Sequence, residues 1–432
     1  MYRRICAALR PISSVRVVAY LFPLVLLCLT FSGCATIPKF QVNGTVADQY
    51  VSTTVDSELS KYYLEHYLQN DHIDPEYDQR IEKALTVWNQ APLDRDTLKE
   101  ITEQFSPDFA TLYFVSRIYQ DPVNRRAQQA FYSHLAAIRT KGEEEMSRVA
   151  RRFQSYLIVF VPGYGYKQNP ATGADFARQR RIMNRAGFQT RLIETEEVGT
   201  VEKNASILAG EVPRLGQRYG NVILVSTSKG GPEVALAIGK LMTPDQLNAV
   251  KAWISIGGLL RGSPEADQAL TWPTSWLARI AFFFEGVPMQ TVKSLHTEKR
   301  RAVFTQLDFP QHIVMLQYVG VPLSGQIPKH VEGRYKGLRR LGPNDGLTLL
   351  ADELIEGGIV VTDVGLDHYY ADPEIDLKTF ALAQVVMDEL ENRKHRGLPR
   401  PGSEGRDQSH SRGKDGGGGM GAFVGVCSAR GG

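Results

Sequence analysis

The chain has 432 residues, of which 43% are hydrophobic and 22% are charged, and its formal net charge is +3. This length can bury a full catalytic core and leave residues for a smaller region. The composition is that of a globular protein and excludes wholesale disorder and a protein of many membrane spans. Residues 1–33 hold four arginines and no acid, so the chain without them carries about −1, which gives no electrostatic case for binding nucleic acid.

Residues 1–33 are typical of a secretion signal. Arginines precede an apolar run, residues 17–31, that is shorter than the about 20 residues of a membrane-spanning helix. The run ends Phe31-Ser32-Gly33-Cys34, which resembles the lipobox of bacterial lipoproteins, with Phe31 in place of the usual Leu. The resemblance implies cleavage before Cys34, a diacylglyceryl group on its thiol with acyl chains such as palmitate, and a lipid-anchored protein on the outer membrane facing the periplasm. The alternative is a plain cleaved signal that releases a soluble protein.

Residues 34–153 are predicted to form a linker and a helical N-terminal subdomain. From Val46 to Phe153 the apolar residues keep helical spacing, and no strand-like run interrupts them. We expect this subdomain to pack on the catalytic core, with binding of a partner as the alternative. Residues 396–432 are rich in Gly, Ser, Arg and Pro and are expected to form a disordered tail. Apart from Cys34, the signal and tail hold all the cysteines, so no intramolecular disulfide is expected.

Residues 154–395 alternate short apolar runs with helical stretches, which predicts an α/β fold with a mostly parallel sheet. The run 156–161 is apolar throughout and ends in Pro-Gly, as expected of a strand buried on both faces. Further strands are predicted at 190–193, 222–225, 252–256, 313–316 and 359–361, with helices at 174–186 and 205–219.

An apolar insertion near residues 261–301 interrupts this alternation. It contains Trp272, Trp276 and the run 280–284, which includes three phenylalanines. The insertion is either a lid over an active site or a buried helix-loop segment.

The predicted strand at 222–225 runs into Ser226-Thr227-Ser228-Lys229-Gly230, with a helix expected at once. This resembles the Gly-x-Ser-x-Gly nucleophile elbow of α/β-hydrolases, with Ser226 in place of the first glycine. The residues two before and two after the nucleophile must be small, because the serine occupies a strained turn. The resemblance implies an α/β-hydrolase fold with Ser228 as nucleophile.

In that family the acid and the histidine follow the nucleophile in this order. Asp345, within Pro343-Asn344-Asp345-Gly346, resembles the acid loop of bacterial lipases, and His368 follows the last predicted strand. The resemblance implies that His368 is the general base and that Asp345 orients it. Asp363 and Asp367 are competing acids. His296, His312 and His330 precede the acid and are expected to be surface or structural residues.

The resemblance also implies an oxyanion hole. One donor is the backbone N–H of Lys229, whose side chain is expected to point to solvent. The other is assigned to the Tyr164 backbone, in the glycine-rich segment 161–166. A merely tight turn is the alternative interpretation of that segment. The segment 254–267 further resembles a strand and loop of bacterial triacylglycerol lipases, with Leu259-Leu260 where that family has Pro-His.

These features predict a serine hydrolase that cleaves carboxylic esters through an acyl-enzyme at the bacterial envelope, in the manner of an esterase or lipase. The expected substrate is an ester or lipid-like small molecule, and no cofactor or metal is expected. The alternative is a catalytically inactive α/β-hydrolase-fold lipoprotein that binds an envelope partner. A metal enzyme is disfavoured, because no ligand-type spacing accompanies Asp367-His368.

Overall fold

The structure, a computed structural model, describes residues 37–271 and 288–395. The predicted signal, the lipid-attachment residue Cys34, the tail and the aromatic part of the insertion (272–287) lie outside these ranges. Among the described helices, none has the length and apolarity needed to cross a membrane.

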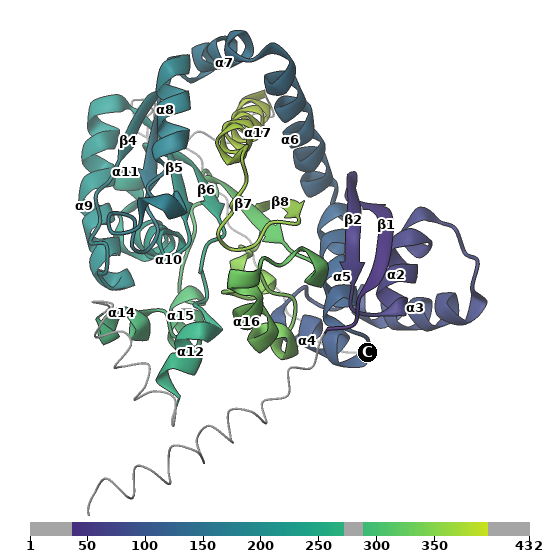
Figure 1. Cartoon of the computed structure of the whole chain (residues 1–432). Coiled ribbons are helices and arrows are strands. Elements are labelled where there is room, and N and C mark those ends of the chain that lie inside the picture. Colours follow the sequence, from purple (N-terminus) through teal and green to yellow (C-terminus); the bar gives the residue numbers. More distant parts are fainter. Residues whose placement is uncertain (1–36, 272–287, 396–432) are drawn as a thin grey trace, which may run out of the picture.

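A six-stranded sheet forms the centre of the molecule (Figure 1). Its order is β4-β3-β5-β6-β7-β8, and each neighbouring pair is parallel. The strands are β3 (Tyr156–Val161), β4 (Gln189–Leu192), β5 (Asn221–Thr227), β6 (Val250–Ile256), β7 (Val314–Val321) and β8 (Ile359–Val364). All six predicted strands are therefore confirmed, and the chain has the predicted α/β-hydrolase fold.

Helices cover both faces of this sheet because the strands are apolar on both faces. In β3, for example, Ile158 and Phe160 pack into one core cluster, and Leu157 and Val159 pack into the other. The first face is covered by α6 (Pro122–Lys141), α7 (Glu143–Ala150), α8 (Ala177–Ala186) and α17 (Ile375–His395). The second is covered by α9 (Val201–Tyr219), α10 (Gly230–Leu236), α11 (Pro244–Leu247) and α15 (Thr297–Phe304). The helices α12 (Pro264–Leu270), α14 (Met289–Ser294) and α16 (Lys329–Leu338) lie at the carboxyl ends of the strands (Figure 1).

The N-terminal region differs from its prediction at its start. Residues 46–55 were expected to be helical, but β1 (Phe40–Val46) and β2 (Gln49–Val55) form an antiparallel hairpin. The turn consists of Ala47 and Asp48, which both have positive φ angles, as a two-residue hairpin turn requires. One face of the hairpin is buried. It carries Val42, Val46, Val51 and Val55, because alternate residues of a strand point to the same face.

The rest of this region is helical, as predicted. Its helices are α2 (Glu58–Glu65), α3 (Pro75–Trp88), α4 (Arg95–Gln104) and α5 (Pro107–Gln120), followed by α6. The helices α3, α5 and α6 begin at Asp-Pro or Ser-Pro pairs, in which the first residue caps the helix and the proline occupies its first turn.

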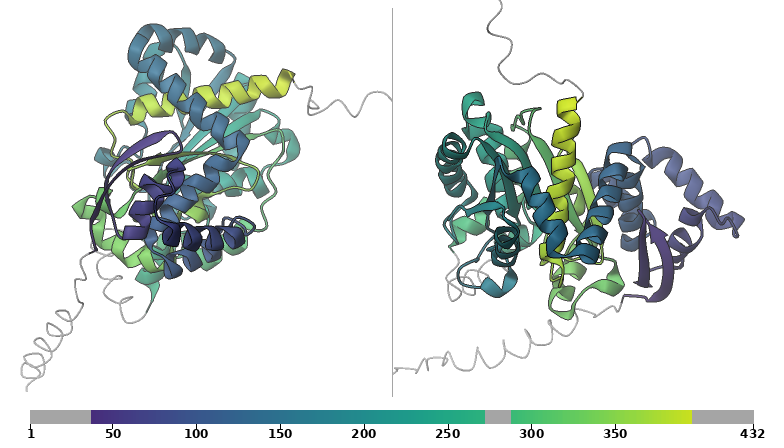
Figure 2. Two further views of the ribbon diagram at one scale, coloured as in Figure 1. Left: turned by 90° about the vertical axis from the view of Figure 1, so that its right-hand side faces the viewer. Right: turned by 90° about the horizontal axis from the view of Figure 1, so that it is seen from above.

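The N-terminal elements lie on the β8 side of the sheet (Figure 2). They share one apolar cluster with the hydrolase core, which includes Val319 and Val321 of β7 and Val360 and Val364 of β8. The N-terminal region therefore packs against the β7–β8 edge of the sheet.

Candidate active site

Ser228 lies in a sharp turn between β5 and α10. Its φ angle is +51°, in the left-handed region that a non-glycine residue rarely adopts. A Cβ atom on Gly230 would lie 2.8 Å from the Pro162 carbonyl oxygen, and one on Gly231 would lie 2.8 Å from Gly258 Cα. Glycine is thus needed at both positions, because the elbow packs directly on neighbouring backbone.

Ser226 takes the place of the first glycine of the elbow for a reason that the structure supplies. Its side chain is fully buried, and Oγ accepts a hydrogen bond of 2.9 Å from the indole Nε1–H of Trp253. Trp253 is itself fully buried on the adjacent strand. Because a buried indole N–H needs an acceptor, the serine hydroxyl here satisfies a core tryptophan.

The structure brings Ser228, His368 and Asp345 together at the carboxyl edge of the sheet. Ser228 Oγ lies 3.0 Å from His368 Nε2, and His368 Nδ1 lies 2.6 Å from Asp345 Oδ2. The other carboxylate oxygen of Asp345 accepts the N–H groups of Leu347 and Thr348 at 2.8 and 2.7 Å. The backbone N–H of His368 also donates to the Asp345 carbonyl at 2.9 Å. These bonds fix the carboxylate and the imidazole against each other.

The two competing acids have other partners. Asp363, on β8, accepts hydrogen bonds from Tyr318 and Lys378. Asp367 Oδ1 accepts the N–H of Tyr369 at 2.8 Å, and burial raises the pKa of Asp367. Of the three candidate acids, Asp345 is the one bonded to the His368 ring.

The three histidines that lie between Ser228 and Asp345 in the sequence have other neighbours. His296 lies 3.6 Å from the Asp267 carboxylate, and His312 Nε2 lies 3.2 Å from the Leu247 carbonyl oxygen. The His330 ring packs beside Tyr369, with centroids 5.6 Å apart.

The two residues assigned to an oxyanion hole lie on the wall of the same pocket as Ser228 and His368. Lys229 directly follows the nucleophile and precedes α10. The segment carrying Tyr164 passes close to the elbow, since a Cβ on Gly163 would lie 3.4 Å from Ser228 Cβ. Both residues therefore lie beside Ser228 in the described structure, and their role as oxyanion donors stays a prediction.

The expectation that the Lys229 side chain points to solvent is wrong. It is 2% exposed, and its ammonium group binds the carboxylate of Glu233, which is fully buried. Burial raises the pKa of Glu233 to about 7, although the charge of Lys229 opposes this shift. Asn204 Nδ2 of α9 donates to the same carboxylate oxygen at 2.8 Å. The Lys-x-x-x-Glu spacing is the feature of the sequence that indicates this ion pair, since it places both residues on one helix face.

The segment 254–267 also lies against the elbow. The N–H of Leu259 donates to the Ser228 carbonyl at 3.1 Å. Ser263, whose hydroxyl donates to the Leu347 carbonyl at 2.6 Å, ties this segment to the loop of Asp345. The resemblance found in this segment thus falls on residues that support the nucleophile and the acid.

A pocket of about 790 Å³ opens beside Ser228 and His368. Its apolar wall includes Phe176 of the segment before α8, Leu259, and Val292 of α14. Glu265 and Arg334, whose side chains are 4.0 Å apart, contribute charged groups. The volume lies within the range of pockets that bind small molecules.

No protein-family model and no curated protein matches this sequence. Among solved structures, the chain is similar to a metagenomic carboxyl esterase, with 21% identity and a TM-score of 0.44 over 55% of this chain and 76% of that one. It is similar to a lipase from Bacillus licheniformis in its mature form, with 23% identity and a TM-score of 0.43 over 54% and 91% of the two chains. A phospholipase from Legionella pneumophila shows 16% identity and a TM-score of 0.38 over 56% and 63%. Similarity at this level carries no argument about substrate, and the α/β-hydrolase fold of this chain follows from its parallel sheet and the turn at Ser228.

Proposed function

We propose that the protein is a serine hydrolase that cleaves carboxylic esters through an acyl-enzyme. The observation that carries the proposal is the continuous series of hydrogen bonds from Ser228 through His368 to Asp345, at the wall of a largely apolar pocket. A serine hydroxyl is a weak nucleophile unless a base within hydrogen-bond reach takes its proton, and the 3.0 Å contact provides that base.

The reaction then has two halves. Ser228 Oγ attacks the ester carbonyl as its proton passes to His368 Nε2, and the N–H groups of Tyr164 and Lys229 stabilise the oxyanion. When the tetrahedral intermediate collapses, His368 returns the proton to the departing alkoxide, so an alcohol leaves and the acyl group stays on Ser228. Water, deprotonated by His368, releases the carboxylic acid and restores the serine. Asp345 stabilises the imidazolium in both halves.

A fluorophosphonate probe tests this proposal, because it forms a phosphonyl–serine bond and loses fluoride only where a serine is activated. We expect the purified full chain to be labelled and Ser228→Ala to resist labelling. Ser206→Ala is the matched control, since Ser206 is exposed on α9 and its hydroxyl bonds only the Glu202 carbonyl in the described structure. Absence of labelling in the folded full chain would instead favour a catalytically inactive binding protein.

Nitrophenyl esters of increasing acyl length define the substrate further. The pocket volume and its apolar wall favour acyl chains of medium length or longer. A kcat/KM that falls steadily from acetate onwards contradicts a lipase-like preference and indicates a general short-chain esterase.

We further propose that Cys34 carries the lipid anchor and holds the enzyme on the outer membrane facing the periplasm. The motif Phe31-Ser32-Gly33-Cys34 after an apolar run supports this. Radiolabelled palmitate should enter the wild-type chain and the Cys427→Ala variant but not Cys34→Ala. Equal incorporation into Cys34→Ala overturns the proposal.

A further inference from the structure

The outer edge of β8 is covered by side-chain amides from the N-terminal subdomain. β8 ends the sheet, so its residues 360, 362 and 364 direct their backbone groups away from β7. Asn124 Oδ1 accepts the N–H of Val360 at 2.8 Å. Gln128, one turn later on α6, accepts the N–H of Thr362 at 2.9 Å and donates to its carbonyl at 3.0 Å.

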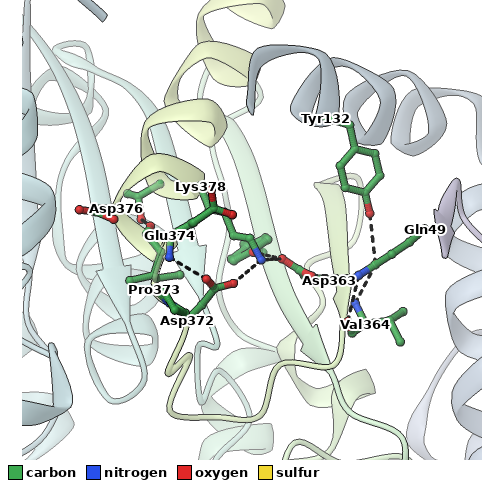
Figure 3. Close-up of polar contacts among 12 residues, drawn as sticks. Gln49, Tyr132, Asp363, Val364, Asp372, Pro373, Glu374, Asp376 and Lys378 are labelled. Atoms are coloured by element: carbon green, nitrogen blue, oxygen red, sulfur yellow. Dashed lines mark hydrogen bonds and ion pairs between the residues drawn. The ribbon is translucent and has the colours of Figure 1, made fainter. Parts of the chain in front are cut away.

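Gln49 of β2 makes a third contact of this kind, with Val364 at the end of β8 (Figure 3). Its Oε1 accepts the N–H of Val364 at 2.9 Å, and its Nε2 donates to the Val364 carbonyl, also at 2.9 Å. The same Nε2 lies 3.2 Å from Asp363 Oδ1, and Tyr132 of α6 donates to Oε1 at 3.1 Å. Gln49 thus holds the last residue of β8, from which the chain continues four residues to His368.

Lys378 of α17 joins the two ends of the segment that carries His368. Its ammonium donates to Asp363 before the histidine, at 2.6 Å, and to Asp372 after it (Figure 3). Lys378 and Asp363 are 8% and 4% exposed, so water screens this contact little. Tyr318 of β7 donates to Asp363 Oδ2, the same oxygen that accepts the Lys378 ammonium, and so helps to orient that carboxylate.

We propose that Gln49 and Lys378 are positioning residues for His368. Lys378 closes segment 364–372 into a loop, and Gln49 fixes the start of that loop from the N-terminal subdomain. Together they hold His368 Nε2 within reach of Ser228 Oγ. On this proposal the N-terminal region helps to position His368 for catalysis. The proposal rests on the function proposed above.

The chain offers a matched pair for the test. Gln49→Leu and Gln128→Leu each remove a glutamine that bonds both backbone groups of one β8 residue, but only Gln49 contacts the residue that begins the loop. A displacement of about 1 Å at a catalytic group costs up to about a hundredfold in rate. We expect Gln49→Leu to lower kcat for a nitrophenyl ester about tenfold or more, with KM changed less than twofold. Gln128→Leu should keep kcat within twofold of wild type, although its melting temperature should fall at least as far as that of Gln49→Leu.

Asp372→Asn tests Lys378 without leaving a lone buried ammonium. The asparagine keeps the oxygen that accepts the N–H of Glu374 at 2.7 Å but loses the charge that faces Lys378. We expect a fall in kcat of at least fivefold at unchanged KM.

Hydrogen–deuterium exchange provides a readout that does not depend on activity. Peptides within 364–372 should exchange faster in Gln49→Leu and Asp372→Asn than in wild type, and at the wild-type rate in Gln128→Leu. Equal kcat in the two leucine variants, or unchanged exchange in Gln49→Leu and Asp372→Asn, overturns the positioning role. If the wild-type chain shows no Ser228-dependent hydrolysis, the proposed function fails, and the exchange data alone still decide whether these residues hold the loop.

Discussion

The ammonium group of Lys229, the residue directly after Ser228, is buried against the carboxylate of Glu233 one helical turn later. The backbone N–H of Lys229 is also the proposed oxyanion donor. The pair therefore fixes the first turn of α10 at the point where negative charge would develop in the reaction.

Removing one member of this pair is expected to destabilise the folded protein. Glu233→Gln leaves a buried ammonium without a counter-charge, which should lower the free energy of unfolding by about 3–5 kcal/mol. The double variant Lys229→Met/Glu233→Gln removes both charges and should regain most of that loss. Urea unfolding measures both effects. Glu103→Gln is the control, because Lys99 and Glu103 have the same spacing on α4 but are exposed, and it should cost less than about 0.5 kcal/mol. Equal losses in Glu233→Gln and Glu103→Gln contradict this account.

Asp345 should be essential to the rate, and Asp367 should not. Asp345→Asn keeps the size of the side chain but removes the charge that stabilises the imidazolium, so kcat for a nitrophenyl ester is expected to fall by about four orders of magnitude. Asp367→Asn, beside the histidine in sequence, keeps the acceptor for the N–H of Tyr369 and should change kcat less than about threefold. A larger effect at Asp367 than at Asp345 would reverse the assignment of the acid.

Restoring the usual glycine of the elbow at position 226 should lower the free energy of unfolding. Ser226→Gly removes the acceptor of the buried Trp253 indole, and an unsatisfied buried donor costs about 1–3 kcal/mol. A double-mutant cycle with Trp253→Phe isolates the contact: in the Trp253→Phe background, Ser226→Gly should cost less. Identical costs in the two backgrounds would show that the hydrogen bond contributes nothing.

A buried pair of acids should make stability depend on pH. Burial, together with the charge of Asp56, raises the pKa of Asp108 from 3.8 to about 7, and Ser324, Arg339 and Tyr335 also face this carboxyl. Because the folded state binds a proton that the unfolded state has released, the contribution of Asp108 is greatest below about pH 4 and is lost as the pH rises through about 7.

The free energy of unfolding should therefore fall between pH 4 and 7 more steeply in wild type than in Asp108→Asn, by up to about 1.4 kcal/mol per pH unit. Urea titrations at several pH values give both slopes. Parallel slopes would show that Asp108 is ionised throughout this range in the folded protein.

The sequence predicted the sheet well because parallel strands buried on both faces consist of unbroken apolar runs, as in β3. Ser228, Asp345 and His368 could be singled out because their order along the chain matches a known pattern. The hairpin of β1 and β2 was missed, because Ala47-Asp48 lacks the Asn-Gly or Asp-Gly that normally marks such a turn.

The burial of Lys229 was missed although its spacing from Glu233 indicated a contact, and the contacts of Gln49 could not be predicted. A lysine after a surface turn is usually solvated, and only the packing of α9 on α10 shows that Asn204 and Glu233 enclose it. Gln49 and Val364 are 315 residues apart, and no local pattern indicates a side-chain amide that bonds a distant backbone.

The amides of Asn124, Gln128 and Gln49 have a consequence for attempts to shorten the protein. A truncated chain that starts near residue 154 would retain all six strands but expose the outer side of β8 as a template for strand addition. Such a fragment should self-associate through β8, and soluble preparations of the protein should require residues 37–153 as well.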